Sequence, residues 1–76
     1  MKIISVKYLS NYILKILFNN GMIKKSNLKS FLFSAINPMT TKYRNLHLFK
    51  KVKVENGYLT WGNGEMDLSA ENILTL

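Results

Sequence analysis

The segment LFKKVKVENGYLTWGNGEMDLSAENILTL, residues Leu48–Leu76, determines more of the expected fold than any other part of the chain. Asn56-Gly57 supplies the positive φ angles that a tight two-residue turn needs, and strand-forming residues lie on both sides of it. The facing pairs of this hairpin are Glu55–Tyr58, Val54–Leu59, Lys53–Thr60 and Val52–Trp61. Side chains alternate along a strand. One face is therefore apolar (Val52, Val54, Leu59 and Trp61), while Lys51, Lys53 and Thr60 point outward.

A short helix follows the glycine turn GNGEMD. Ser69 is its expected N-cap, with a hydroxyl that accepts a hydrogen bond from the backbone N–H of Asn72. Glu71 in the first turn complements the helix dipole. Leu68 lies just before the cap and can pack against Ile73 as a hydrophobic staple. This part of the chain is therefore predicted as strand, turn, strand, turn and capped helix.

The first third reads as a meander of three strands, Ile3–Leu9, Tyr12–Phe18 and Met22–Lys25. Ser10-Asn11 separates the first two strands, and Asn20-Gly21 separates the last two. A two-residue loop at the second turn pairs Phe18 with Ile23 and Ile16 with Lys25.

The middle strand of the meander is apolar on both faces. Leu14, Ile16 and Phe18 share one face because side chains alternate with period two. Ile13 and Leu17 lie on the other face, and pairing across Ser10-Asn11 adds Ile4, Val6 and Tyr8 to it. A second apolar face needs a cover, which a helix of the chain, a second copy or a partner protein could each provide. The candidate partner-binding residues are Ile4, Val6, Tyr8, Ile13, Leu17 and Trp61. For Trp61 the alternative is a core position, which is the commoner one for a lone tryptophan on the apolar face of a hairpin.

The middle of the chain predicts short helices. Ser26-Asn27 is a plausible N-cap for a helix over 28–35, which ends before Asn37-Pro38 because the residue before proline disfavours helix. The segment Pro38–Lys42 shows no periodicity, and Arg44–Lys50 predicts a single helical turn. The expected fold is α+β, a small antiparallel sheet of about five strands (two hairpin units) with two or three short helices, in a single domain over residues 1–76.

Length and composition bound the protein class. A chain of 76 residues with no cysteine, one histidine and four carboxylates lacks disulfides and is poorly supplied with metal ligands. Self-association is the ordinary stabiliser that remains, so a homo-oligomer is one expectation. The apolar start is interrupted by Lys7, Asn11 and Lys15, which argues against a signal peptide or a membrane span. We expect a cytoplasmic protein without a membrane partner.

Charge is unevenly distributed along the chain. All eleven Lys and Arg residues lie between Lys2 and Lys53, and the four acids follow from Glu55 onward, for a net charge of +7. A/T-rich codon usage explains such an excess as well as a used basic surface does. A used surface would attract nucleic acid, anionic lipid or an acidic protein. The candidate nucleic-acid-binding residues are Lys24, Lys25, Lys29, Lys42, Arg44, Lys50, Lys51 and Lys53.

The last third resembles the bacterial family of domains of unknown function numbered 2442. The residues that carry the resemblance are Phe49, Val52, Val54, Trp61, Asn63, Gly64, Asp67, Leu68, Ser69, Glu71 and Leu74. Ala70 stands where the family usually has proline, and Glu65-Met66 adds length before Asp67. The resemblance implies a small α+β protein without established activity, often encoded beside another small protein in pairs that resemble toxin–antitoxin modules. It implies partner binding and supplies no catalytic residues.

Catalytic chemistry finds little support among the residues. His47 has no second histidine for a metal and only Glu55 within ten residues to orient it, so we expect a partly exposed structural residue. Asp67 and Glu71 have the spacing of a carboxylate pair, but both flank the helix cap, where acids are expected. Gly62 and Gly64 lack the remaining residues of a phosphate-binding loop. We expect no enzyme activity, cofactor, metal or small-molecule substrate.

The sequence thus favours a non-catalytic interaction module, an antitoxin-like or accessory subunit that acts through a protein partner. The alternative is a nucleic-acid-binding regulator that uses the basic residues of the first two-thirds of the chain. Without base-reading arginines or a known reading motif, such binding would be directed at the backbone and would depend on salt.

Overall fold

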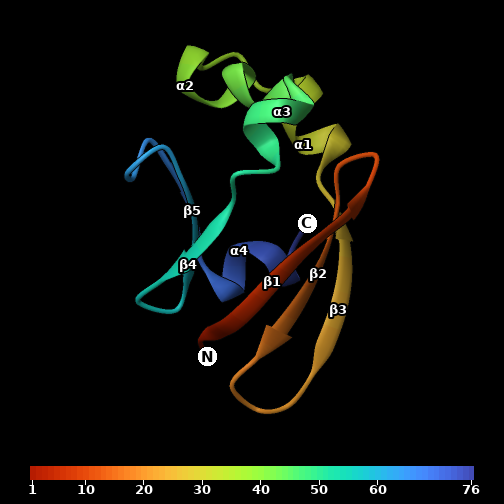
Figure 1. Ribbon diagram of the computed structural model, residues 1–76, viewed down its shortest axis with the longest axis vertical. Helices are drawn as coiled ribbons and strands as arrows, with labels where there is room; N and C mark the ends of the chain where they lie inside the picture. The colour runs from red at the N-terminus through yellow and green to blue at the C-terminus, as the bar shows by residue number, and fades with distance from the viewer.

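The computed structural model describes residues 1–76 and contains two three-stranded antiparallel sheets with four short α-helices (Figure 1). Sheet A consists of β1 (Ile3–Ser10), β2 (Ile13–Phe18) and β3 (Ile23–Asn27), and sheet B of β4 (Lys53–Glu55), β5 (Tyr58–Trp61) and β6 (Met66–Leu68). The helices are α1 (Lys29–Ser34), α2 (Pro38–Thr41), α3 (Leu46–Phe49) and α4 (Ala70–Leu74), with a 3-10 turn η1 (Lys42–Arg44). The α+β class is confirmed. The expected sheet of about five strands is corrected to six strands in two sheets, and the helices number four.

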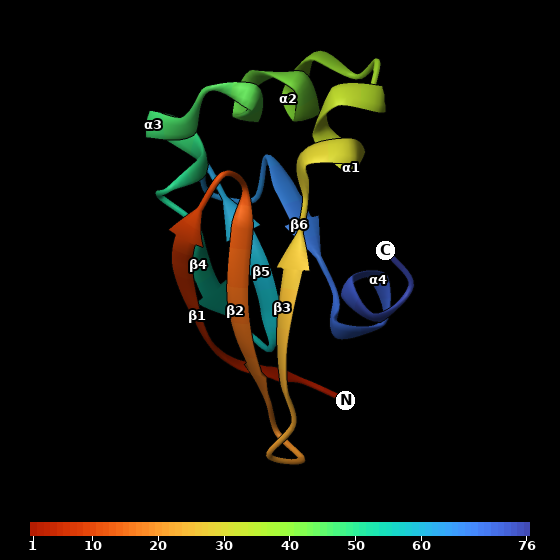
Figure 2. The same ribbon diagram turned by 90° about the vertical axis from the view of Figure 1, so that its right-hand side faces the viewer.

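The two sheets stand opposite each other, and the helices close two of the remaining sides. Helices α1, α2 and α3 form a cap over one end of the sheets, while α4 lies beside β3 (Figures 1 and 2). A cluster of 14 buried apolar residues from both sheets, the cap and α4 fills the space between them. Trp61 is completely buried in this cluster, and its indole N–H donates to the carbonyl oxygen of Phe49 at 2.9 Å.

Sheet B follows the sequence closely. The pairs Glu55–Tyr58, Val54–Leu59 and Lys53–Thr60 are confirmed, because Asn56 and Gly57 take the positive φ angles of 52° and 82° that the turn requires. Strand β6 was not predicted. Met66 and Leu68 alternate with Asp67 and are buried against the core, so the expected glycine turn is shorter and ends in a third strand.

Sheet A differs from the predicted register by one residue at each turn. The second loop contains three residues, Asn19, Asn20 and Gly21, with Gly21 at φ +86°. Leu17 therefore pairs with Ile23 and Ile16 with Lys24, so the predicted partners of Phe18 and Ile16 are wrong. A two-residue loop and a three-residue loop with glycine at its end carry similar sequence signals, which is why the loop length was missed.

The first turn of sheet A uses Asn11 and Tyr12, both at positive φ, and not Ser10-Asn11. A register shift between Tyr8 and Ser10 leaves Leu9 as an extra residue next to this turn, and a second shift leaves Ile4 as an extra residue at the other end of β1. Val6 then pairs with Ile16 and Tyr8 with Leu14, which turns both toward the core. The expectation that Val6 and Tyr8 share the second face with Ile13 and Leu17 is therefore wrong.

The helical cap is more ordered than the sequence suggested. Pro38–Thr41 is a helix, because proline occupies its first turn and the side chain of Asn37 accepts a hydrogen bond from the backbone N–H of Met39. Ser26 belongs to β3, and Asn27 accepts from the backbone N–H of Lys29 just before α1. The expected turn near Arg44–Lys50 is confirmed as α3, with Phe49 buried.

The closing helix α4 is capped as predicted. Ser69 accepts from the backbone N–H of Asn72 at 3.0 Å, and the Asn72 side chain accepts from the backbone N–H of Ser69 at 3.0 Å. Leu68 and Ile73 are both buried in the core cluster, consistent with the staple. No helix of the chain has the length and apolar character needed to cross a membrane.

Candidate functional site

The outer face of sheet A carries three lysines directly opposite one another. Lys7 of β1 pairs with Lys15 of β2, and Lys15 pairs with Lys25 of β3. Neighbouring strands lie about 4.8 Å apart, so the three backbone positions form a row across the sheet. We call these residues the lysine row.

Less charged residues flank the lysine row on both sides. The pairing places Ser5, Leu17 and Ile23 in the adjacent row, with Ser10, Ile13 and Asn27 beyond the row on the other side. Ile23 is 57% exposed, and Leu17 and Ile13 are half-buried. A shallow hollow lies over two lysines of the row and their neighbours, lined by Ser5, Val6, Lys7, Lys15, Leu17 and Ile23. The face thus combines positive charge with accessible apolar surface.

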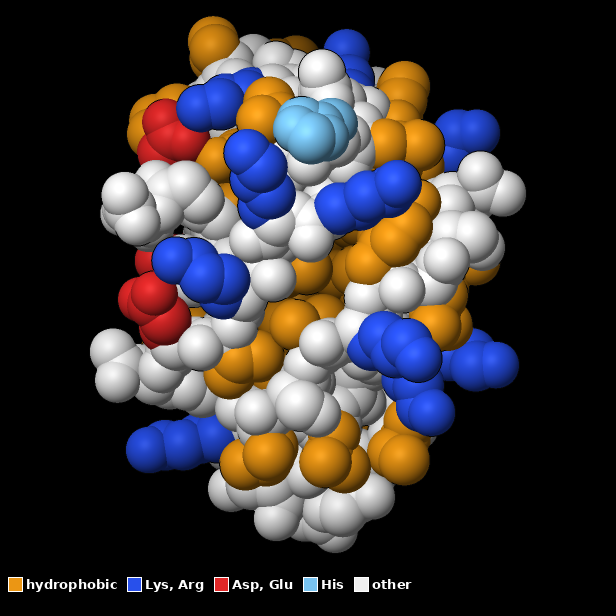
Figure 3. Space-filling model, in the orientation of Figure 1, with side chains coloured by type: hydrophobic (Ala, Val, Ile, Leu, Met, Phe, Trp, Pro, Cys, Tyr) orange, Lys and Arg blue, Asp and Glu red, His pale blue; other side chains and the backbone are white.

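Nothing in the fold covers this face. Figure 2 shows sheet A in front of sheet B, with the cap above it and α4 to one side. In Figure 3 the acidic side chains in view lie on the side of sheet B, and none lies on the side of sheet A. The acids of the chain are Glu55, Glu65, Asp67 and Glu71, and none of them lies in sheet A.

The predicted partner-binding residues separate into two groups. Ile13 and Leu17 lie on the outer face, and Ile4, at the register shift of β1, is 54% exposed. Tyr8 packs its ring against Phe49, while Val6 contacts the core.

Trp61, the sixth predicted residue, is completely buried and therefore presents no surface to a partner. The residues that the sequence reasoning missed are Lys7, Lys15 and Ile23, while Lys25 was named only as a candidate for nucleic-acid binding. Alternation of lysine with apolar residues in the first two strands was the available signal, and it needed the correct register to be read.

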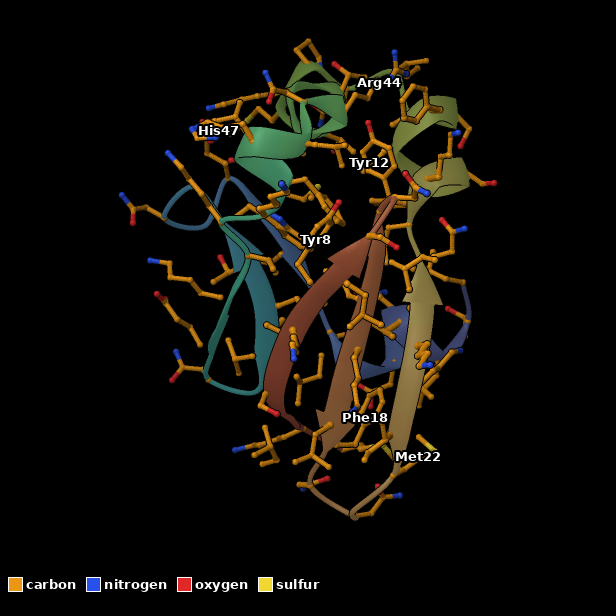
Figure 4. The ribbon with its side chains drawn as sticks, turned by 45° about the vertical axis from the view of Figure 1, so that its right-hand side comes forward. Tyr8, Tyr12, Phe18, Met22, Arg44 and His47 are labelled. Atoms are coloured by element: carbon orange, nitrogen blue, oxygen red, sulfur yellow. The ribbon has the colours of Figure 1, made fainter.

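Arg44 is engaged within the protein. Its guanidinium group donates to the carbonyl oxygens of Leu32, Phe33 and Ala35 at 2.9, 3.2 and 2.9 Å. These carbonyl groups lie at the C-terminal end of α1, where helical carbonyls lack backbone partners, so the Arg44 side chain satisfies the end of this helix. Figure 4 shows Arg44 in the cap above Tyr12, whose hydroxyl donates to the Arg44 carbonyl oxygen.

Most of the other predicted nucleic-acid-binding residues also have partners within the chain. Lys42 pairs with Glu65 at 2.8 Å, and Lys53 with Glu55 at 3.6 Å. The Lys24 ammonium group donates to the carbonyl oxygen of Ile73 at 3.4 Å, and that of Lys50 lies 5.3 Å from the ring centroid of Tyr8. Lys25 belongs to the lysine row, and Lys29 and Lys51 are exposed on α1 and after α3. The eight residues therefore belong to several surfaces.

Glu65 connects the loop before β6 with the cap. Its carboxylate accepts from Lys42 at 2.8 Å and from the Tyr43 hydroxyl at 2.7 Å. These two hydrogen bonds, that of Lys42 first, hold the pKa of Glu65 below its ordinary value. Burial, reinforced by Glu65, raises the pKa of Tyr43 to about 12. A Cβ atom on Gly62 would lie 2.3 Å from the Glu65 carboxylate and 2.3 Å from the Tyr43 hydroxyl, so the contact between these two groups requires glycine at position 62.

The remaining polar groups do not form a reactive constellation. His47 is exposed and lies in the cap at the surface (Figure 4). No three His, Cys, Asp or Glu side chains come close enough together to hold a metal ion. A second hollow lies on the outer face of sheet B, lined by Glu55, Asn56, Tyr58, Thr60, Asn63, Gly64 and Asp67.

Comparisons with known proteins gave one match, to a family model. No curated protein and no solved structure matches the chain. The model of one family, described as a protein of unknown function (DUF2442), matches residues 3–76 and so includes both sheets, the cap and α4. The chain belongs to the DUF2442 family.

Proposed function

We propose that this protein is a non-catalytic interaction module that acts in the cytoplasm by docking on a protein partner, as an antitoxin-like or accessory subunit does. The docking surface is the outer face of sheet A. The single observation that carries the proposal is that this face is uncovered while it exposes Ile23 and leaves Ile13 and Leu17 half-buried.

The energetics favour an external cover for this face. Burial of apolar surface contributes roughly 25 cal/mol per Å², and contiguous exposed apolar surface commonly marks interaction sites. The chain's own helices are already used elsewhere, since α1 to α3 cap one end and α4 lies beside β3. A partner is therefore the cover that completes the fold of sheet A.

The test is co-expression with the product of the adjacent reading frame, followed by co-purification. Leu17→Asp places a charge in the middle of the proposed surface and is expected to abolish co-purification. Ile36→Asp is the matched control, because Ile36 is 94% exposed in the loop between α1 and α2. The control variant is expected to retain the partner.

Two results would contradict the proposal. One is retention of the partner by Leu17→Asp at the wild-type level, with folding verified by circular dichroism. The other is a strict monomer that binds no protein at high concentration. Retention on single-stranded or duplex DNA in place of a protein would favour the nucleic-acid alternative, for which Lys25, Lys29 and Lys51 are the available residues.

A further inference from the structure

We propose that the partner surface is acidic: it presents carboxylates to the lysine row Lys7–Lys15–Lys25 and apolar side chains to the flanking residues. This inference rests on the proposed function, since it names the chemistry of what docks on the outer face of sheet A. It assigns the lysine row as the residues that select the partner.

The lysine row is unfavourable in the isolated protein. Like charges directly opposite each other on neighbouring strands are destabilising, and Lys15 faces a lysine on both sides. Five other basic residues are compensated by Glu65, Glu55, backbone carbonyl groups or an aromatic ring, namely Lys24, Lys42, Arg44, Lys50 and Lys53. Lys2, Lys29 and Lys51 are exposed without such a contact, but none of them faces another lysine across a sheet. No such contact is found for the three lysines of the row. An external anion is the missing counterpart.

A second copy of the chain does not fit this requirement on the same face. A two-fold contact between outer faces of sheet A would bring two lysine rows together, and no acid of sheet A could compensate them. Because like-charge juxtaposition in an interface is costly, the lysine row acts against self-pairing. The lysine row therefore does not pair with itself, and the occupant that we assign to it is a different chain that presents carboxylates.

An acidic protein segment fits better than a nucleic acid. Single-stranded nucleic acids are bound on platforms where bases stack on exposed aromatic rings, with arginine contributing as well. The outer rows of sheet A contain lysine, serine, asparagine, leucine and isoleucine, and no aromatic residue or arginine. Leu17 and Ile23 on one side and Ile13 on the other match apolar side chains that flank carboxylates.

The experiment uses isotope-labelled full-length protein and three defined probes. These are a short peptide of alternating glutamate and leucine, the same peptide with glutamine in place of glutamate, and an oligothymidylate. Amide chemical shifts are followed on titration at low and at raised salt. The glutamate peptide is expected to shift residues of β1, β2 and β3 on the outer face, with an affinity that falls as salt rises.

Lys15→Glu and Lys51→Glu form the matched pair of variants. Both reverse one exposed lysine, but Lys51 lies outside the sheets and in no ion pair. Lys15→Glu is expected to weaken binding of the glutamate peptide at least about tenfold, while Lys51→Glu changes it less than about twofold. Lys15→Glu should fold normally, because it replaces a like-charge contact with two opposite-charge ones.

Several outcomes would overturn the inference. Equal binding of the glutamine peptide, or equal weakening by both variants, would show that the lysine row does not select the partner by its charge. Preferential binding of oligothymidylate assigns the row to nucleic acid. Absence of binding by the glutamate peptide also overturns it.

The co-purified partner separates failure of this inference from failure of the proposed function. If Leu17→Asp releases the partner and Lys15→Glu does not, the docking face stands and the acidic partner is wrong. If neither variant releases it, the docking face itself is wrong.

Discussion

The two sheets of this protein have the same number of strands, but their outer faces differ in charge. Across sheet B the corresponding row is Lys53, Thr60 and Asp67, so a base and an acid lie on either side of a hydroxyl. Lys53 also pairs with Glu55 on its own strand at 3.6 Å. Across sheet A the row is lysine three times, without an acid.

The two outer faces also differ in how far the chain itself covers their side chains. Thr60 points outward and is still only 3% exposed, so neighbouring side chains cover it within the chain. Sheet A keeps half-buried and exposed apolar side chains beside uncompensated charge. The lysine of the sheet B row has an acid nearby within the chain, while no acid lies among the three lysines of sheet A.

The inner faces of the two sheets should not differ in this way, because both contribute to one core. Substitutions in that core are expected to have the largest effect on stability. Leu14 of β2 and Leu59 of β5 are both completely buried in the same cluster. Leu14→Ala and Leu59→Ala are each expected to cost about 2–5 kcal/mol of unfolding free energy, from lost burial and the cavity left behind. Urea denaturation measures both. A cost below about 1 kcal/mol for only one of them would mean that the sheets do not share one core.

A smaller difference in stability is expected between glycine substitutions in the turns of the two sheets. Gly21 and Gly57 have φ values of +86° and +82°, so alanine at either site is expected to cost about 1–2 kcal/mol. A Cβ atom on Gly57 would also lie 2.9 Å from the Lys2 side chain, while one on Gly21 meets open space. Gly57→Ala should therefore be the more destabilising variant in thermal denaturation. The reverse order would contradict the close packing of the N-terminal residues on the turn of sheet B.

Charge reversal on the outer faces should act in opposite directions. Lys15→Glu creates two opposite-charge pairs in sheet A and is expected to stabilise by about 0.2–1 kcal/mol for each pair. Lys53→Glu removes the contact with Glu55 in sheet B and is expected to destabilise by up to about 1 kcal/mol. Melting temperatures at low salt, and their convergence at high salt, check both. Equal signs for the two variants would remove the distinction between the faces.

The smallest effect at neutral pH concerns the link between sheet B and the cap. The pKa of Tyr43 is raised to about 12 from 10.0, so the folded state keeps its proton after the unfolded state has lost it. The stability from this group is complete below pH 10 and is lost as the pH rises towards about 12. Unfolding free energies of the wild type and Tyr43→Phe, measured across this range, should differ in slope. Parallel curves would show that Tyr43 does not titrate differently on folding.

The sequence predicted sheet B better than sheet A for a local reason. Asn56-Gly57 and the cap at Ser69 define their structures within a few residues, so the hairpin and α4 could be read directly. In sheet A the register depends on Tyr12, which adopts a left-handed conformation at φ 66° that a bulky residue rarely takes. Its ring packs against Phe33 and Phe49, which come later in the chain. No local pattern reports such a contact.

The lysine row of the candidate site was missed for the same reason. Ile13 and Leu17 were identified as a second apolar face from alternation alone, which needs no pairing. The lysine row exists only when Lys7, Lys15 and Lys25 are aligned, and a slip of one residue separates them.

The extra residue at Ile4 has a consequence for length variation in this protein. Ile3 and Val6 both face the core although three positions separate them, because Ile4 is accommodated at the register shift. Deleting Ile4 would restore plain alternation and leave every later side chain of β1 oriented as before. Deleting Lys7, between Val6 and Tyr8, would turn the inner side chains of β1 outward and the outer ones inward from that point. We therefore expect loss of one residue to be tolerated at the first site and to be disruptive at the second.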